Sequence, residues 1–238
     1  MRRGLLLVLP VALLLAGCGG DDEEAMPTDT GTVTTPVETA TVKVYLLRGG
    51  KVWPTLREID ETEDVMTAAV DALRMGPTEQ EVDLGFNSAI PESEDVELSR
   101  AALAQLVYTL TQFSSTDSAE VNGVNYTRGD FEDLTPAILV ESPLAFEEVT
   151  SRLRVTGTAN TFEATFSYEL TDTDGLIVDE NFVTATSGTG TRGTFDFTTD
   201  EFTVPFDGIG ALIVFERSAK DGSRINLVEI PVKIAKER

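Results

Sequence analysis

The side chains that most often carry enzymatic chemistry are scarce in this sequence. None of the 238 residues is histidine, and Cys18 is the single cysteine. Without an imidazole, the chain cannot build a Ser-His-Asp or Cys-His site or hold zinc through histidine. The lysines, such as Lys43, Lys51 and Lys220, have no serine three residues before them, so a Ser-Lys dyad is not indicated either. We therefore expect no enzymatic activity, no cofactor and no metal site.

Carboxylates are abundant and leave one chemical alternative open. A hydrolase that cleaves glycosides would bring two of them to within about 5 to 9.5 Å of each other in a cleft, which counting cannot exclude. The run Asp172-Thr173-Asp174-Gly175 resembles the start of a calcium loop, but Val183 stands where such a loop has its bidentate glutamate. A hairpin turn that uses Asp and Gly for their backbone preferences is the better interpretation of this run.

Cys18 follows a segment with the layout of a secretory signal. Arg2 and Arg3 form a positive start, and an apolar run from Leu5 to Leu15 comes before small residues. The run is well short of the roughly 20 residues needed to cross a bilayer, so cleavage is favoured over a membrane helix. We assign residues 1–17 to a signal peptide.

The ending Leu15-Ala16-Gly17-Cys18 resembles the lipobox of bacterial lipoproteins. That resemblance implies that the Cys18 thiol receives a lipid and becomes the first residue of the mature chain, which would lie at the extracytoplasmic face of the cytoplasmic membrane. Two acyl chains anchor a protein stably, whereas one gives only marginal attachment. A buried structural cysteine is the alternative, disfavoured because Gly19, Gly20 and a polar run follow at once.

Composition constrains the partners. The formal charge is −23, and loss of Arg2 and Arg3 with the signal peptide would take it to −25. Such a chain repels nucleic acid and anionic head groups, so we expect no nucleic-acid partner and membrane attachment only through the lipid on Cys18. Residues 18–40 are acidic and rich in Thr and Pro, and they predict a disordered linker.

Residues 41–130 predict an α+β domain with a small sheet and two helices. Strands are expected at 42–46 and 51–59, with Pro54 at a bulge or an unpaired edge position. A helix capped by Thr62 should end before Gly76. A second helix is expected from Ser99 to Phe113, and its predicted buried stripe consists of Leu103, Leu106, Val107, Leu110 and Phe113.

The order of these blocks resembles the GerMN domain of sporulation and spore germination proteins. The resemblance is carried by Leu73-Arg74-Met75-Gly76-Pro77, by the run from Leu84 to Pro91, and by the helix from Arg100 to Leu110. The family has a strand pair between Pro91 and Ser99, where this chain has seven residues, too few for two strands. We therefore expect a sheet that is one strand narrower, with either an exposed edge or a changed partner surface.

Residues 137–238 predict an all-β sandwich. Phe162, Ala164, Phe166, Tyr168 and Leu170 alternate with polar residues, and further short strands with turn signals follow. The blocks Val140-Glu141-Ser142-Pro143, Val155-Thr156-Gly157-Thr158-Ala159, Phe162-Glu163-Ala164 and Asp172-Thr173-Asp174-Gly175 resemble the immunoglobulin-like domain of bacterial spore germination. The expected architecture is thus an α+β domain followed by an immunoglobulin-like sandwich.

The first sheet also offers candidate contacts for a ligand. Tyr45 and Trp53 could form an aromatic platform for a glycan or a peptide, although core packing is the simpler interpretation. Arg48 and Arg57 could meet a partner carboxylate. Our leading hypothesis is a lipid-anchored, non-catalytic interaction module in envelope or sporulation-type machinery, with envelope proteins as partners. The alternative is a lipoprotein that binds peptidoglycan or another glycan.

Overall fold

The computed structural model describes residues 38–93, 95–113 and 118–236. The predicted signal peptide, Cys18 and nearly all of the predicted linker lie outside these residues. Residues 37–238 group as one compact unit. Most of the regular structure is β, with a two-sheet sandwich at the C-terminal end, and the first part agrees only loosely with the predicted α+β arrangement.

A hairpin of two long strands starts the described chain. β1 (Thr39–Arg48) and β2 (Lys51–Asp60) pair in an unbroken antiparallel register from Thr39 and Asp60 to Arg48 and Lys51. Gly49 and Gly50 join them with positive φ angles of 59° and 74°, as a tight hairpin turn of the type I′ class requires. The sheet has the order β2-β1-β3, because β3 (Phe86–Asn87) pairs with the last two residues of β1.

Pro54 lies opposite Tyr45 without a bulge. The backbone N–H and C=O of Tyr45 point away from β2 and form hydrogen bonds with Thr109 and Gln105. Tyr45 and Pro54 are therefore a non-hydrogen-bonded pair of the β1-β2 ladder. The ring nitrogen of Pro54 therefore faces the outer edge of the sheet, where no ladder bond is lost. Of the two predicted settings for Pro54, the edge position is the correct one.

Three α-helices accompany this sheet: α1 (Val65–Arg74), α2 (Glu79–Asp83) and α3 (Arg100–Leu110). The N-cap of α1 is Asp64 and not Thr62, because the carboxylate of Asp64 accepts from the N–H of Thr67 at 3.1 Å. Ser99 caps α3 as predicted, although the helix ends at Leu110 and does not reach Phe113.

The buried face of α3 differs from the predicted stripe, of which only Val107 is buried. The buried positions are Ala102, Ala104, Gln105, Val107, Tyr108 and Thr109. The physical reason is that the edge of β1 opposite β2 pairs with β3 only at Leu47 and Arg48, which leaves the middle residues of that edge without a strand. Polar side chains of α3 must then face β1.

Three side chains of α3 and its C-terminal turn cover the edge of β1. Gln105 Nε2 donates to the backbone carbonyl oxygen of Tyr45 at 2.8 Å, and Thr109 Oγ1 accepts from the backbone N–H of Tyr45 at 3.1 Å. The Gln112 side chain accepts from the backbone N–H of Lys43 at 2.9 Å and donates to the backbone carbonyl oxygen of Lys43 at 2.6 Å. The edge expected to be exposed is therefore satisfied by side chains.

A second hairpin and a short helix lead to the sandwich. β4 (Ser118–Val121) and β5 (Val124–Thr127) are joined by Asn122 and Gly123, both at positive φ. A 3-10 segment, η1 (Arg128–Leu134), follows directly. No helix in the described part of the chain is both long and apolar enough to span a membrane.

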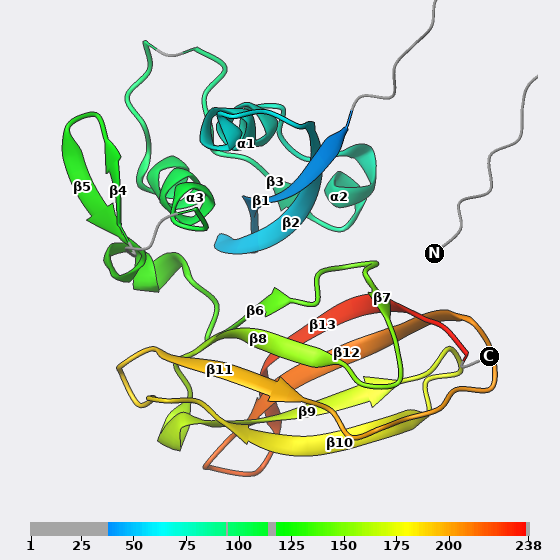
Figure 1. The fold of residues 1–238 in the computed structure, drawn as a ribbon. Helices are drawn as coiled ribbons and strands as arrows, with labels where there is room; N and C mark the ends of the chain where they lie inside the picture. The colour runs from blue at the N-terminus through cyan, green and yellow to red at the C-terminus, as the bar shows by residue number, and fades with distance from the viewer. Residues whose placement is uncertain (1–37, 94, 114–117, 237–238) are drawn as a thin grey trace, which may run out of the picture. The chain divides into compact units, whose positions relative to one another are not determined.

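Two sheets form the C-terminal sandwich and face each other in Figure 1. One has the order β11-β8-β6, from β6 (Ile138–Ser142), β8 (Arg154–Ala159) and β11 (Gly193–Thr198). The other has the order β10-β9-β12-β13-β7, and its strands are β7 (Glu148–Val149), β9 (Thr165–Thr171), β10 (Ile177–Thr184), β12 (Gly208–Arg217) and β13 (Arg224–Ile234). All pairs are antiparallel except β13 with β7.

Aromatic and aliphatic side chains from both sheets fill the sandwich. The rings of Phe166 and Phe195 meet edge to face with centroids 4.9 Å apart, and Gly157 leaves room for this contact. The predicted strand from residue 162 is wrong at its start. Residues Phe162–Ala164 form a 3-10 turn, η2, and Phe162 is 52% exposed.

Candidate functional site

Tyr45 is fully buried and therefore does not form a surface platform with Trp53. Its hydroxyl donates to the carboxylate of Glu141, and the Arg128 guanidinium lies 5.4 Å from its ring centroid. The same guanidinium lies 4.7 Å from the ring of Tyr108. Burial, and then the nearby carboxylate, raise the pKa of Tyr45. Its role is structural.

Glu141 is the centre of this buried cluster. Its side chain is only 13% exposed and accepts from Arg128 Nη1 at 2.8 Å and from Lys43 Nζ at 3.2 Å. Burial works to raise the pKa of Glu141, but the charges of Arg128 and Lys43 and the Tyr45 hydrogen bond hold it below its ordinary value. Every charged group in the cluster has a partner, so the cluster joins β1, η1 and β6 and offers no free acid or base.

The sequence analysis missed this cluster. Glu141 stands 96 and 98 residues from Tyr45 and Lys43. No spacing rule links residues so far apart. The only available signal was a glutamate inside an otherwise apolar strand, Ile138-Leu139-Val140-Glu141, which calls for a buried partner.

Arg57 is also engaged inside the first part of the chain. Its guanidinium pairs with both oxygens of Glu81, at 2.9 and 2.6 Å, and donates to the oxygen of Gly76 at 3.1 Å. The arginine side chain is 12% exposed. Arg57 thus fastens α2 and the end of α1 to β2, and it does not present a cation to a partner.

Trp53 and Arg48 come together at an apolar groove, here called the Trp53 groove. Trp53 is half-buried, its Nε1 donates to the oxygen of Arg48 at 3.0 Å, and Arg48 is exposed over the ring of Phe86. The groove has a volume of about 300 Å³. Its lining residues are Arg48, Trp53, Pro54, Leu84, Phe86, Val140, Leu144, Ala145, Val228, Glu229, Ile230 and Pro231.

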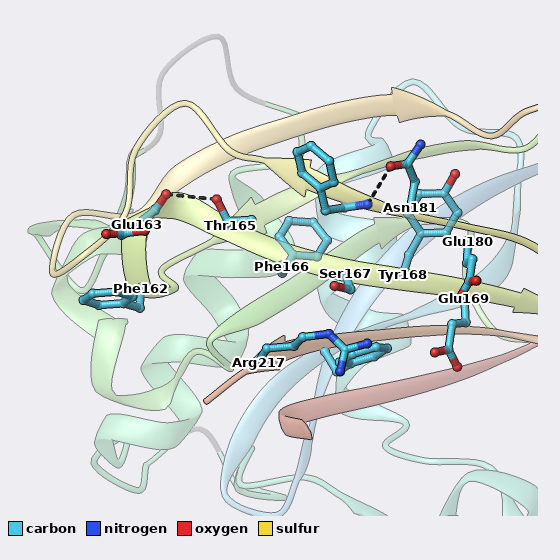
Figure 2. Close-up of a pocket in the computed structure, with 12 residues that line it drawn as sticks. Phe162, Glu163, Thr165, Phe166, Ser167, Tyr168, Glu169, Glu180, Asn181 and Arg217 are labelled. Atoms are coloured by element: carbon cyan, nitrogen blue, oxygen red, sulfur yellow. Dashed lines mark hydrogen bonds between the residues drawn. The ribbon is translucent and has the colours of Figure 1, made fainter. Parts of the chain in front are cut away.

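A larger hollow, here called the outer-face pocket, lies on the solvent side of the five-stranded sheet (Figure 2). Its volume is about 510 Å³. Its lining comes from η2, β9, β10 and β12: Phe162, Glu163, Thr165, Phe166, Ser167, Tyr168, Glu169, Glu180, Asn181, Phe182, Phe215 and Arg217. The exposed aromatic rings of Phe162 and Phe182 are 52% and 69% accessible. No sequence signal singled out this surface.

Asp172 uses its carboxylate for the turn, as the hairpin interpretation requires. Its Oδ1 accepts from the nitrogens of Asp174 and Leu176, at 3.0 and 2.9 Å. Among the described residues, no group of three or more cysteine, aspartate or glutamate side chains is placed to hold a metal ion. The Trp53 groove and the outer-face pocket are both open surfaces of the described chain that carry exposed or half-buried aromatic side chains.

Comparison with protein families assigns the sandwich. Residues 137–223 match the family described as the immunoglobulin-like domain of bacterial spore germination. The matched segment contains β6 to β12 and all residues of the outer-face pocket. A search of curated proteins finds no match to the chain. The resemblance of the sandwich to this family is therefore confirmed for its matched residues.

Proposed function

We propose that this protein is an extracytoplasmic lipoprotein, anchored through a lipid on Cys18, that serves as a non-catalytic interaction module in envelope or germination-type machinery. In this proposal, residues 41–130 are a GerMN-like domain that acts together with the sandwich. The partners are envelope proteins. The protein uses neither a cofactor nor a metal.

The observation that carries the proposal is the family match over residues 137–223. An immunoglobulin-like domain from germination proteins fits a role in protein assembly, and the open apolar surfaces of the sandwich are of the kind that bind proteins. The buried cluster around Glu141 supports joint action of the two parts, because charged side chains from both meet in it.

The anchor is tested by metabolic labelling with an alkyne fatty acid in the native host. We expect label on the wild-type chain and in the membrane fraction, and loss of both in Cys18→Ala. A labelled Cys18→Ala chain, or an unlabelled wild-type chain, would overturn the anchor.

The interaction role is tested by photo-crosslinking from the anchored full chain in intact cells. A photoreactive residue replaces Met66, Val124, Phe182 or Phe206, which are all at least 49% exposed. We expect one membrane or cell-wall protein to be captured reproducibly from some positions and not from others. The Cys18→Ala chain should lose this product. Recovery of peptidoglycan without any protein product would replace the interaction module by a glycan-binding lipoprotein.

The glycan alternative keeps one specific observation in its favour. Trp53 and Arg48 line the Trp53 groove, and an indole beside an arginine can bind a sugar with an acidic substituent. Sedimentation of the chain with purified peptidoglycan tests it. Binding lost in Trp53→Ala and kept in Phe182→Ser would support this alternative.

A further inference from the structure

The strand β10 forms one end of the five-stranded sheet and pairs only with β9 within it. Ala185 follows the last residue of β10, and its backbone N–H donates to the backbone carbonyl oxygen of Ala164. Because bonded and non-bonded pairs alternate in an antiparallel ladder, the N–H and C=O groups of Glu180, Phe182 and Thr184 point away from β9. The N–H of Phe182 is taken up by the side chain of its own neighbour, Asn181, at 2.9 Å (Figure 2). This edge is open to an added strand.

The outer-face pocket begins at the same edge. Phe182 and Phe215 both lie opposite Ser167, on the neighbouring strands on its two sides. The small side chain of Ser167 between two phenylalanines leaves a hollow on the sheet face. Phe215 is buried because the guanidinium groups of Arg217 and Arg224 lie 5.2 and 4.3 Å from its ring centroid.

Phe162 borders the pocket just before the start of β9, where it belongs to a constrained turn. Glu163 and Ala164 both have positive φ angles, of 53° and 59°, which side-chain-bearing residues adopt at an energetic cost. The N–H of Phe162 donates to the buried carboxylate of Glu216 at 2.8 Å, and the N–H of Glu163 donates to Thr189 at 3.0 Å. The exposed ring of Phe162 is therefore presented in a fixed place.

Charge in the pocket selects the partner. Glu180 and Glu169 are direct neighbours across β10 and β9, an arrangement in which like charges repel. Arg224 pairs with both oxygens of Glu169, at 2.9 and 2.5 Å. Glu180 is exposed on the free edge, in a chain whose formal charge is −23. Because Arg224 already offsets the charge of Glu169, a lysine or arginine from a partner would pair with Glu180.

We propose that the outer-face pocket and the β10 edge together bind an extended segment of a partner protein that carries an apolar and a basic residue two positions apart, so that both side chains face the pocket. The segment adds a strand to β10. Its apolar side chains pack on Phe182 and Phe162, and a basic side chain reaches Glu180. This inference rests on the proposed interaction function and adds to it the chemistry of the partner.

The test uses the full purified chain and two labelled nine-residue peptides. In the first peptide, every second residue is phenylalanine or lysine in turn, with threonine between them, and in the second, glutamate replaces lysine. We expect fluorescence anisotropy to show binding of the basic peptide alone. Phe182→Ser should weaken it about tenfold or more, because an exposed aromatic anchor is lost. Thr184→Pro should weaken it similarly, because the outward N–H needed by an added strand is removed.

Matched controls separate this site from general attraction to an acidic protein. Glu180→Lys and Glu148→Lys change the net charge equally, but Glu148 lies on β7 at the opposite end of the sheet. Phe206→Ser removes a ring of similar exposure outside the pocket. We expect Glu148→Lys and Phe206→Ser to bind as the wild type does, and Glu180→Lys to bind more weakly. Circular dichroism melting should show all variants folded.

Equal weakening by Glu180→Lys and Glu148→Lys, or unchanged binding in Phe182→Ser, would overturn the inference. So would equal binding of the acidic peptide. If crosslinking in cells still captured an envelope protein from Met66 or Val124, the interaction function would survive that result. Loss of protein products at every crosslinking position would remove the interaction function itself.

Discussion

Arg128 Nη1 lies 2.8 Å from Glu141 Oε1. This ion pair joins the start of η1 to the C-terminal end of β6. The Arg128 side chain also bonds to Thr111 Oγ1 at 2.7 Å and to the oxygen of Tyr108 at 3.2 Å. One arginine thus fixes the end of α3 and β6 at once. The stability of the chain should depend on this pair more than on any exposed ion pair.

Replacement of Glu141 by glutamine should lower the free energy of unfolding by about 2 to 4 kcal/mol, because the buried charge of Arg128 loses its counterion. Urea unfolding at neutral pH measures this value. Glu58→Gln, at an exposed position on β2, is the matched control and should change it little. Equal effects of the two substitutions would contradict the assigned role of Glu141.

The same pair predicts a pH dependence. The pKa of Glu141 is lowered in the folded chain, where the charges of Arg128 and Lys43 outweigh the effect of burial. Its stabilisation is therefore complete above the ordinary pKa of a glutamate and is lost as the pH falls through the lower, folded-state pKa. The difference in stability between the wild type and Glu141→Gln should narrow across that acidic range. If the stability difference between the wild type and Glu141→Gln stayed constant down to pH 3, the carboxylate of Glu141 would not be the source of this pH dependence.

Gln105→Ala should destabilise the chain by about 2 to 3 kcal/mol, because it leaves the buried backbone carbonyl of Tyr45 and the partly buried N–H of Ala89 without a partner. The Gln105 side chain is fully buried. It donates to the backbone carbonyl oxygen of Tyr45 and accepts from the backbone N–H of Ala89 at 2.7 Å. Gln80→Ala, on the exposed helix α2, serves as the control in the same unfolding assay. Similar losses in both variants would show that α3 does not protect the β1 edge.

Gly157→Ala should be among the most damaging single substitutions in the sandwich. A Cβ at this position would lie 2.1 Å from the oxygen of Leu139 and 2.6 Å from the Phe195 ring, so the strands must separate. We expect a loss of more than about 3 kcal/mol, beyond the usual cost of overpacking. At Gly129 the nearest atom to an added Cβ is 3.5 Å away, and Gly129→Ala should be tolerated. A soluble Gly157→Ala chain with the same melting temperature as the wild type would refute the predicted loss of stability.

Trp53 is the only tryptophan, so the intrinsic indole emission reports on the surroundings of this side chain, which include the Trp53 groove. We expect partial quenching by acrylamide, because the ring is half-buried. A glycan bound in the groove should reduce this quenching. The basic peptide bound at the outer-face pocket should leave it unchanged, since Trp53 does not line that pocket. Protection of Trp53 by the peptide would show that it binds in the groove.

Local patterns predicted the strands well and the helix faces poorly. The β1-β2 hairpin and most sandwich strands follow from alternation and turn residues, which act over a few positions. The buried face of α3 depends on which groups of β1 lack a partner, and this is a property of the assembled sheet. Apolar periodicity alone favoured Leu103 and Leu106 over Gln105 and Thr109.

The candidate surfaces were least accessible to sequence reasoning. Tyr45 and Arg57 were chosen as contacts because aromatic and cationic residues often bind ligands, yet each satisfies a group within the fold. The outer-face pocket depends on Phe162 leaving the strand. The predicted alternation placed this ring in the core, and the constrained turn at Glu163 turned it to solvent.

The contacts of α3 with β1 carry an evolutionary consequence. Gln105, Thr109 and Gln112 perform the task of a neighbouring strand. A strand inserted between Pro91 and Ser99 and paired with β1 would perform the same task, and selection on all three side chains would then relax together. Loop length and the identities at these three positions should therefore covary among relatives, and a lineage could exchange one solution for the other only through several coordinated changes.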